Sequence, residues 1–263
     1  MKIVDEVRNA DTIAISGHIR PDGDCVGSGL GLYLYLRKTL PEAEIDVYLE
    51  KPADIFNCIS HIEEIKSEIN LNKIYDVFIA LDCSDDRLGD VRPLFENARR
   101  TINIDHHISN PGCGDVRIIE PKRSSTAELL YDLMDADQVD EEVAAALYIG
   151  IIHDTGVLRY SNTSPRTLQI VAELIKFGFD FSSIIEKTFY EKTYVQTQIM
   201  GRAILESVRF MHDRCIVSMV SRRMMEFYQV TPKDLDGIVN QLQAVKGVEC
   251  AIFMYETGTL EYK

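Results

Sequence analysis

The stretch "TINIDHHISN", residues 101–110, places one carboxylate and two imidazoles directly after a short apolar run. The run at 101–104 is apolar nearly throughout, which is typical of a strand covered on both faces of a sheet. It is energetically unfavourable to place the ionisable side chains of Asp105, His106 and His107 close together. Both histidines can change charge near neutral pH. Such a group at the end of a buried strand indicates a chemical site.

Three further runs resemble the one at 101–104 and are also predicted to be strands: "TIAIS" at 12–16, "IDVYL" at 45–49 and "DVFIAL" at 76–81. Helix-like stretches at 26–40 and 55–69 lie between them. Alternation of strands and helices predicts an α/β fold with a parallel sheet.

Helices are expected to dominate after a short strand-like run at 116–120. They are predicted at 124–134, where Ser125 and Glu128 form a capping-box signature, and at 140–152 and 164–178. The predicted organisation is a catalytic domain at 1–180, a helical linker at 181–206 and a smaller α+β domain at 207–263. The end of the sequence is expected to form a hairpin whose second strand has barely begun, so we expect the natural chain to continue.

Bulk composition excludes some classes of protein. The 263 residues suffice for two domains, and the formal net charge of −14 argues against a protein that coats long nucleic acid. Six cysteines without a CxxC pair suggest reduced thiols, and the N-terminus lacks a signal-peptide pattern. The longest uncharged apolar run, at 143–152, is shorter than the ~20 residues of a membrane span, so we expect a cytoplasmic protein.

Potential metal ligands follow several predicted strands. Because the carboxyl ends of parallel strands meet at one edge of a sheet, these side chains are expected to lie close together. A single Asp in such a place usually caps a helix, and a lone His usually packs, but their recurrence at one edge favours a metal site. The candidates are His18, Asp22 and Asp24 after the first strand, Asp82 after the third, Asp105, His106 and His107 after the fourth, and Asp154 in "GIIHDTG".

The types of ligand favour particular ions. Carboxylates and imidazoles without thiolates suit Mn²⁺ and similar divalent ions better than structural zinc. There are too many of them for one ion with an open position, so two ions about 3.5–4 Å apart fit better. Asp82 is the expected bridge, because it enters alone on a central strand.

Four motifs, "HIRPDGDCVGS", "LDCSD", "NIDHHISN" and "HDTG", together resemble those of the DHH phosphoesterases, in the family order and over about residues 10–180. The resemblance implies a parallel-sheet DHH domain followed by a DHH-associated domain. It also implies that His107 faces the substrate phosphate, with Asp105 orienting the histidines. The implied ligands are His18, Asp22 and Asp82 for one ion, and Asp24, Asp82, His106 and Asp154 for the other.

"PDGD" followed by "GSGLGL" resembles the nanoRNase, or oligoribonuclease, and pAp-phosphatase branch of that family. This branch implies a manganese-dependent hydrolase with a water activated by two metals, and it suggests a homodimer. It would cleave short oligoribonucleotides to 5′-mononucleotides, and 3′-phosphoadenosine 5′-phosphate (pAp) to AMP. Arg20, Ser125 and Arg159 lie in or beside the motifs and are candidates for substrate contact.

Other functions stay open at this point. They include a phosphodiesterase for pApA or cyclic di-AMP, a manganese pyrophosphatase, a non-catalytic nucleotide-binding module and a metal-stabilised structural domain. Pyrophosphatases of the family typically have Thr where Gly23 stands, and "SRRMMEFY" at 221–228 keeps only part of their basic segment. The family's Gly-Gly-Gly-His segment does not occur, so the C-terminal domain is expected to be truncated.

Overall fold

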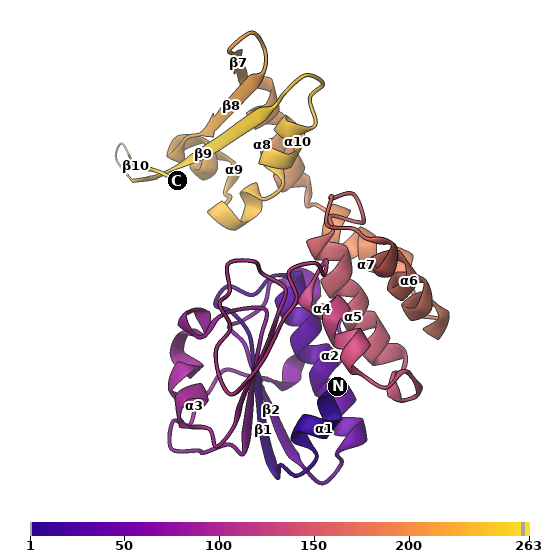
Figure 1. The fold of residues 1–263 in the computed structure, drawn as a ribbon. Coiled ribbons are helices and arrows are strands. Elements are labelled where there is room, and N and C mark those ends of the chain that lie inside the picture. The colour runs from indigo at the N-terminus through magenta and orange to yellow at the C-terminus, as the bar shows by residue number, and fades with distance from the viewer. Residues whose placement is uncertain (1, 259–260) are drawn as a thin grey trace. The chain divides into compact units, whose positions relative to one another are not determined.

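The computed structural model describes residues 2–258 and 261–263. The chain divides into two compact units, one ending at Tyr190 and the other running from Glu191 to Lys263 (Figure 1). This division falls within the segment 181–206 that was predicted to be a linker. Each unit is described by itself below.

The first unit contains a six-stranded sheet in which every neighbouring pair is parallel. The spatial order is β3-β2-β1-β4-β5-β6, so the order reverses between β1 and β4. This reversal is the topological switch point, outside which α/β sheets commonly bind ligands. The strands are β1 (Thr12–Ser16), β2 (Glu44–Tyr48), β3 (Ile65–Lys66), β4 (Val77–Leu81), β5 (Thr101–Asp105) and β6 (Val116–Ile119). The prediction of an α/β fold with a parallel sheet is confirmed.

Helices cover both faces of this sheet (Figure 1). The main core lies between the sheet and α2 (Gly23–Thr39), α4 (Thr126–Leu133) and α5 (Glu141–Asp154). A smaller core on the other face contains Tyr48, Tyr75 and Phe78 beneath α3 (Arg92–Asn97). The remaining helices of the unit are α1 (Ile3–Val7), α6 (Pro165–Leu174), α7 (Phe181–Ile185) and a π-helical turn, η7 (Glu186–Tyr190).

The prediction of a helix at 55–69 is wrong. The segment forms two 3-10 turns, η1 (Asp54–Phe56) and η2 (Ile62–Glu64), followed by β3. Its apolar residues have helical spacing, but His61 takes the left-handed conformation (φ 62°), which interrupts a helix. Tertiary contacts then extend the chain: Lys66 pairs with the buried carboxylate of Asp46 at 2.6 Å, and Asp46 also pairs with Lys73 at 2.7 Å.

Other short turns lie between the main elements of the first unit. They are η3 (Asp85–Arg87), η4 (Gly89–Val91), η5 (Ala136–Gln138) and η6 (Ile175–Phe177). The expected end of a helix at Gly178 is observed, since this residue has φ 91° directly after η6. Among the helices of the described residues, none has the length and hydropathy needed to cross a membrane.

The second unit is a smaller sheet with helices, as predicted. Its strands β7 (Val208–Phe210), β8 (Cys215–Val220), β9 (Cys250–Gly258) and β10 (Glu261–Tyr262) have the order β10-β9-β8-β7. Helices α8 (Tyr194–Leu205), α9 (Arg222–Tyr228) and α10 (Ile238–Gln243) share a core with this sheet, and η8 (Pro232–Leu235) precedes α10. β9 and β10 pair antiparallel, as a hairpin requires, but the expected turn at 259–260 lies outside the described residues.

Helices α2 and α5 approach each other closely at Gly27. A Cβ atom on Gly27 would lie 2.5 Å from the carbonyl oxygen of Ala146 and 2.7 Å from the backbone nitrogen of Gly150. Gly29, two residues on, is different, because a Cβ there would meet nothing nearer than a methyl group of Leu49 at 3.5 Å. The absence of a side chain at Gly27 therefore sets the separation of the two helices.

This contrast gives a matched pair of substitutions. We expect Gly27→Ala to lower the free energy of unfolding by about 1–3 kcal/mol, because the backbone of α5 must move away. We expect Gly29→Ala to leave it unchanged or to raise it by up to about 1 kcal/mol, since alanine restricts the unfolded chain. Urea unfolding of both variants measures this, and equal effects of the two substitutions would contradict the packing described.

Candidate metal centre

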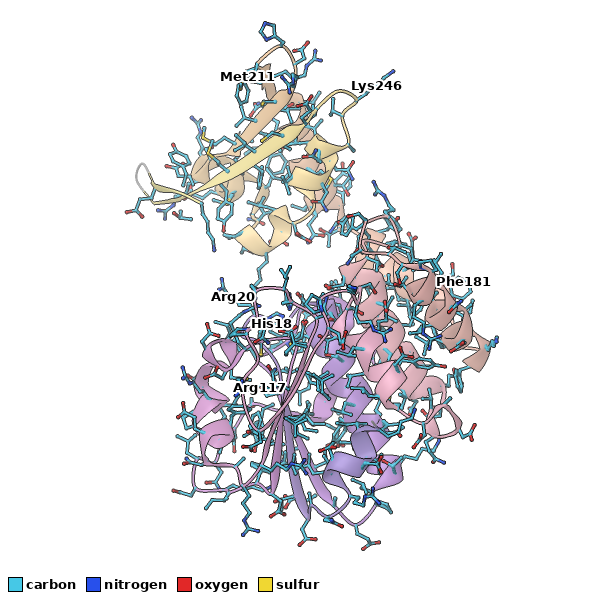
Figure 2. All side chains as sticks on the ribbon, in the orientation of Figure 1. His18, Arg20, Arg117, Phe181, Met211 and Lys246 are labelled. Carbon is cyan, nitrogen blue, oxygen red and sulfur yellow. The ribbon has the colours of Figure 1, made fainter. Side chains whose placement is uncertain are left out.

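The residues that were predicted to hold metal come together at the carboxyl edge of the first unit's sheet. His18 follows β1, and Asp22 caps α2 by accepting hydrogen bonds from the backbone nitrogens of Asp24 and Cys25, both at 3.1 Å. Asp82 follows β4, while the Asp-His-His run spans the end of β5. Asp154 is the last residue of α5. Figure 2 shows His18 at the end of the sheet from which these loops emerge.

Asp82 lies at the centre of this group and is 1 % exposed. Its Oδ2 is 3.5 Å from Nε2 of His18, and its Oδ1 is 3.6 Å from Nε2 of His106. The two carboxylate oxygens therefore face two different histidines. The backbone of Asp82 has φ 59°, a left-handed conformation that is uncommon outside glycine, and its nitrogen donates to the carbonyl of Ile104.

The first group of ligand atoms surrounds His18. Its Nε2 is 3.5 Å from Oδ2 of Asp22 and equally far from Asp82, while its Nδ1 lies 2.9 Å from the carbonyl oxygen of Ile19. A neutral ring that donates from Nδ1 to this carbonyl presents the lone pair of Nε2 to a cation. The sulfur of Cys25 is also near, but burial and the charge of Asp82 raise the pKa of this thiol, which disfavours the thiolate that metals bind.

The second group surrounds His106. Its Nε2 lies 3.0 Å from Oδ2 of Asp154 and 3.8 Å from Oδ2 of Asp24. Within the described part of the chain, this buried nitrogen has no partner with hydrogen-bond geometry. Nδ1 is 3.3 Å from the carbonyl oxygen of Arg123, to which it can donate. A buried ring nitrogen that points at converging carboxylates without a hydrogen bond fits a metal ligand, so the residues suit a cation.

Electrostatics at the site also favour cations. Burial raises the pKa of Asp24 well above its usual range, and the charges of Asp82 and Asp154 raise it further. Burial likewise raises the pKa of Asp82. Burial lowers the pKa of His106, but Asp154 and Asp82 outweigh it and raise that pKa above its ordinary value. Crowded carboxylates that resist ionisation are stabilised in their charged form by a bound divalent ion.

Asp105 is fully buried and holds the two histidines that follow it. Its Oδ1 accepts hydrogen bonds from the backbone nitrogens of His106 at 2.6 Å and His107 at 3.0 Å, and from Nδ1 of His107 at 2.7 Å. Its Oδ2 accepts from the side chain of Asn110 at 2.6 Å. Burial raises the pKa of Asp105, but these bonds lower it below the usual range, while Asp105 raises the pKa of His107. The side chain of His107 is 40 % exposed, so it can meet a ligand from solvent.

The beginning of α4 orients two of the carboxylates, which sequence reasoning missed. The backbone nitrogens of Thr126 and Ala127 donate to the two oxygens of Asp24, at 2.6 and 2.9 Å. The hydroxyl of Thr126 donates to Oδ1 of Asp82 at 3.0 Å. The signal that could have found them is a helix that starts shortly after β6, where its first N–H groups are available to acids.

Glu128 anchors this helix start. The expected hydrogen bond from the backbone nitrogen of Glu128 to the hydroxyl of Ser125 is present at 3.0 Å. The side chain of Glu128 does not complete a capping box at Ser125. It accepts instead from the hydroxyls of Ser124 at 2.5 Å and Thr167 at 2.7 Å. The carboxylate is 1 % exposed, so these bonds are made away from water.

The three residues considered for substrate contact differ in their exposure to solvent. Arg20 is exposed beside His18, and its backbone nitrogen donates to Oε2 of Glu50 at 2.6 Å (Figure 2). Arg159 is also exposed, on the turn after α5. Ser125 is fully buried and its hydroxyl caps α4, so capping is the role that the geometry supports.

The Thr126 hydroxyl can be tested through cation binding. Thr126→Val keeps the shape of the side chain but removes the hydrogen bond to Asp82, so we expect Mn²⁺ affinity to fall by about 10–100-fold. Thr126→Ser keeps the hydroxyl and should restore most of the affinity. Isothermal titration with Mn²⁺ measures both.

The control is Thr101→Val, which removes a hydroxyl that bonds Asp115 at the opposite end of the sheet. It should lower stability without changing Mn²⁺ affinity. Unchanged Mn²⁺ affinity in Thr126→Val would contradict the positioning role of Thr126.

Cation binding should also depend on pH through His18. Burial lowers the pKa of His18, but hydrogen bonds with Asp22 and Asp82 outweigh burial and raise it to about 10 in the cation-free protein. Because a cation takes the neutral imidazole, it must displace this proton at neutral pH. We expect the apparent Mn²⁺ affinity to rise by up to about tenfold per pH unit from about pH 7 to 9, with proton release on binding. Calorimetric titrations in buffers of different ionisation enthalpy measure the number of protons released. A Mn²⁺ affinity that does not change between about pH 7 and 9 would contradict this prediction.

Comparison with known proteins agrees with the family that the four motifs indicate. The model of the DHH family, N-terminal domain, matches residues 12–151. The bifunctional oligoribonuclease and PAP phosphatase NrnA of Thermus thermophilus is 29 % identical over 259 residues, which is 97 % of this chain and 76 % of that protein. The protein of the same name from Bacillus subtilis is 25 % identical over 254 residues, 94 % of this chain and 78 % of that protein.

A solved structure shows the same fold. The crystal structure of an exopolyphosphatase-related protein from Bacteroides fragilis matches with a TM-score of 0.87 at 24 % identity, covering 96 % of this chain and 78 % of that one. The relatives named as hydrolases confirm the resemblance that the four motifs indicate. Since the family model spans more than half of the chain and includes most of the residues gathered at the sheet edge, the chain belongs to the DHH family.

Proposed function

We propose that this chain is a metal-dependent phosphoesterase that hydrolyses short oligoribonucleotides to 5′-mononucleotides and pAp to AMP. The observation that carries the proposal is the Asp82 carboxylate, whose two oxygens face His18 and His106 at the switch point of the sheet. The names of the relatives from Thermus thermophilus and Bacillus subtilis support this choice of substrates.

The proposed centre holds two divalent cations, with Mn²⁺ favoured by a donor set of carboxylates and imidazoles. His18 and Asp22 would hold one, Asp24, His106 and Asp154 the other, and Asp82 both. A pair of cations bound there would supply positive charge to the phosphate oxygens and lower the pKa of water.

His107 is the proposed contact to the attacked phosphate. Asp105 holds its Nδ1 at 2.7 Å and raises the pKa of the ring, which favours the protonated form. A protonated imidazole can donate a hydrogen bond to a phosphate oxygen and stabilise the charge that develops there. Asp105 acts through His107 and is thus a positioning residue.

The substrates are proposed to be small. A chain with a net charge of −14 repels a long polyanion, because binding to long nucleic acid depends on many Lys and Arg contacts to phosphates. A short nucleotide needs only the local positive charge of a metal centre. The acidic surface thus favours oligonucleotides of a few residues over longer ones.

A hydrolysis panel tests the proposal. The protein, supplemented with Mn²⁺, is assayed on pApA, a short RNA ladder, pAp, cyclic di-AMP and pyrophosphate. We expect turnover of short RNA and pAp, and in Asp82→Asn a fall of about a thousandfold or more, since losing several kcal/mol of charge stabilisation costs that much rate.

The matched control is Asp76→Asn, at the other end of β4, where the carboxylate accepts from the backbone nitrogens of Asp11 and Thr12 at 3.0 Å. This variant should lower stability and keep turnover. Preference for pyrophosphate or cyclic di-AMP would assign the chain to another branch of the family. Mn²⁺ binding without any hydrolysis would contradict the proposal and indicate a nucleotide-binding module or a metal-stabilised domain.

A further inference from the structure

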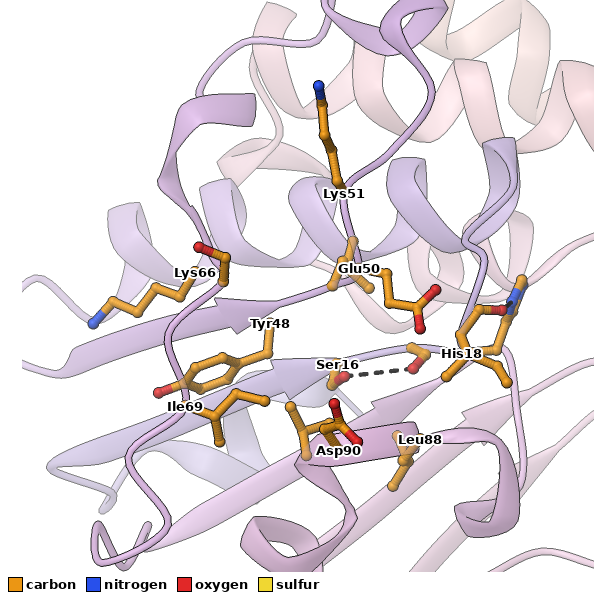
Figure 3. A pocket seen from close by; sticks show the side chains of 14 residues that line it. Ser16, His18, Tyr48, Glu50, Lys51, Lys66, Ile69, Leu88 and Asp90 are labelled. Carbon is orange, nitrogen blue, oxygen red and sulfur yellow. Dashed lines mark hydrogen bonds between the residues drawn. The ribbon is translucent and has the colours of Figure 1, made fainter. Parts of the chain in front are cut away.

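A cavity of about 150 Å³ lies beside His18, at the carboxyl ends of β1 and β2 (Figure 3). It is lined by the segment from Ser16 to Ile19, by Tyr48 and the residues that follow β2, and by the chain just after β3. Leu88, Asp90 and Val91, in and before η4, complete it. None of its polar groups was needed to assemble the candidate metal centre, apart from His18.

The cavity occupies the switch point of the sheet. The strand order reverses between β1 and β4, and the lining residues come from the loops after these two strands as well as from the end of β2. In α/β folds of this strand order, nucleotides bind in the crevice outside the carboxyl ends of the strands. His18 belongs both to this cavity and to the candidate metal centre, so a ligand could reach from one to the other.

Much of the wall is apolar. Tyr48 is 3 % exposed and belongs to the smaller core, as do Leu88 and Val91, while Ile69 packs against that core. Cavities that bury a drug-sized ligand are roughly 300–1,000 Å³. A cavity of about 150 Å³ therefore fits a single ring system and is too small for a dinucleotide.

Two carboxylates, those of Glu50 and Asp90, are among the polar groups that line the cavity. Figure 3 shows the carboxylates of Glu50 and Asp90 on the side of Ser16, whereas the ammonium groups of Lys51 and Lys66 point away. Lys66 is paired with Asp46 at 2.6 Å, and Lys51 lies 3.7 Å from Asp54. Among the residues that the structure describes, no cation pairs with Glu50 or Asp90. These two carboxylates repel phosphate, so the cavity suits a neutral group that donates hydrogen bonds.

We propose that this cavity is a nucleobase subsite, which takes the base of a nucleotide whose phosphate lies at the metal centre. The inference rests on the proposed function and adds base selection to it. The apolar wall covers the faces of the ring, and Asp90 accepts from an exocyclic amino group. Adenine and cytosine carry such a group, whereas uracil presents a carbonyl oxygen at the same position and is repelled by the carboxylate.

A comparison of substrates that differ only in their base tests the proposal. With Mn²⁺ present, kcat/KM is measured for pAp, for its uridine counterpart and for an abasic ribose bisphosphate. We expect the protein to favour the adenine compound over the uracil compound by about ten- to a hundredfold, the usual effect of a hydrogen bond to a charged group. Asp90→Ala should abolish this preference, mainly through KM, and leave turnover of the abasic compound unchanged.

Two further variants make the result specific. Ile69→Trp fills the cavity from a partly exposed position and should reduce kcat/KM for both base-bearing compounds but not for the abasic one. Asp86→Ala removes an acid of the same loop that does not line the cavity, and it should behave like the unaltered protein. An unchanged base preference in Asp90→Ala together with unchanged kcat/KM for the base-bearing compounds in Ile69→Trp, with thermal unfolding showing that both variants fold, would overturn the subsite.

A binding measurement distinguishes two outcomes: that the base subsite is absent, and that the proposed hydrolysis does not occur. Equilibrium dialysis of AMP and UMP with the Mn²⁺-loaded protein requires no turnover. Tighter binding of AMP that Asp90→Ala abolishes would support the subsite, even if no compound were hydrolysed. Equal binding of AMP and UMP in the unaltered protein would overturn it, even if pAp were hydrolysed.

Discussion

The arrangement at the sheet edge depends on one buried carboxylate. Asp82 leaves β4 in a left-handed conformation and is 1 % exposed, with a histidine near each of its oxygens. A buried charge among other acids is unfavourable unless cations neutralise it. Strands β1, β4 and β5 deliver the groups around Asp82 because their carboxyl ends meet at this edge. The candidate metal centre therefore depends on the topology as much as on the individual residues.

Helix packing outside the candidate metal centre sets the positions of its carboxylates. Gly27 brings α2 and α5 together. Asp24 lies in the first turn of α2 and Asp154 is the last residue of α5, so this packing brings the two acids close to each other. The start of α4 then donates to Asp24 and Asp82, while Glu128 holds that start through buried hydroxyls. Because Asp24 and Asp82 are oriented by donors on another element, this part of the site is preorganised for cations.

Sequence patterns predicted the strands and the metal-ligand candidates, because buried parallel strands are apolar throughout and the acids follow them directly. They failed at 55–69, where helical spacing was overridden by the left-handed residue His61 and by the pairing of Lys66 with Asp46. The roles of Thr126 and Glu128 depend on contacts between distant segments, which periodicity does not report. The cavity beside His18 was also not predictable, since four separate segments line it.

The proposed function depends on Asp82 joining two cation positions. The most direct measurement is electron paramagnetic resonance of the protein titrated with Mn²⁺ to saturation, with metal analysis of the same samples. Two ions that share a carboxylate at about 3.5–4 Å are expected to be exchange-coupled, so a coupled spectrum should appear at two Mn²⁺ per chain. Asp82→Asn should abolish the coupling. Saturation at one Mn²⁺ per chain, or an uncoupled spectrum at two, would contradict the account.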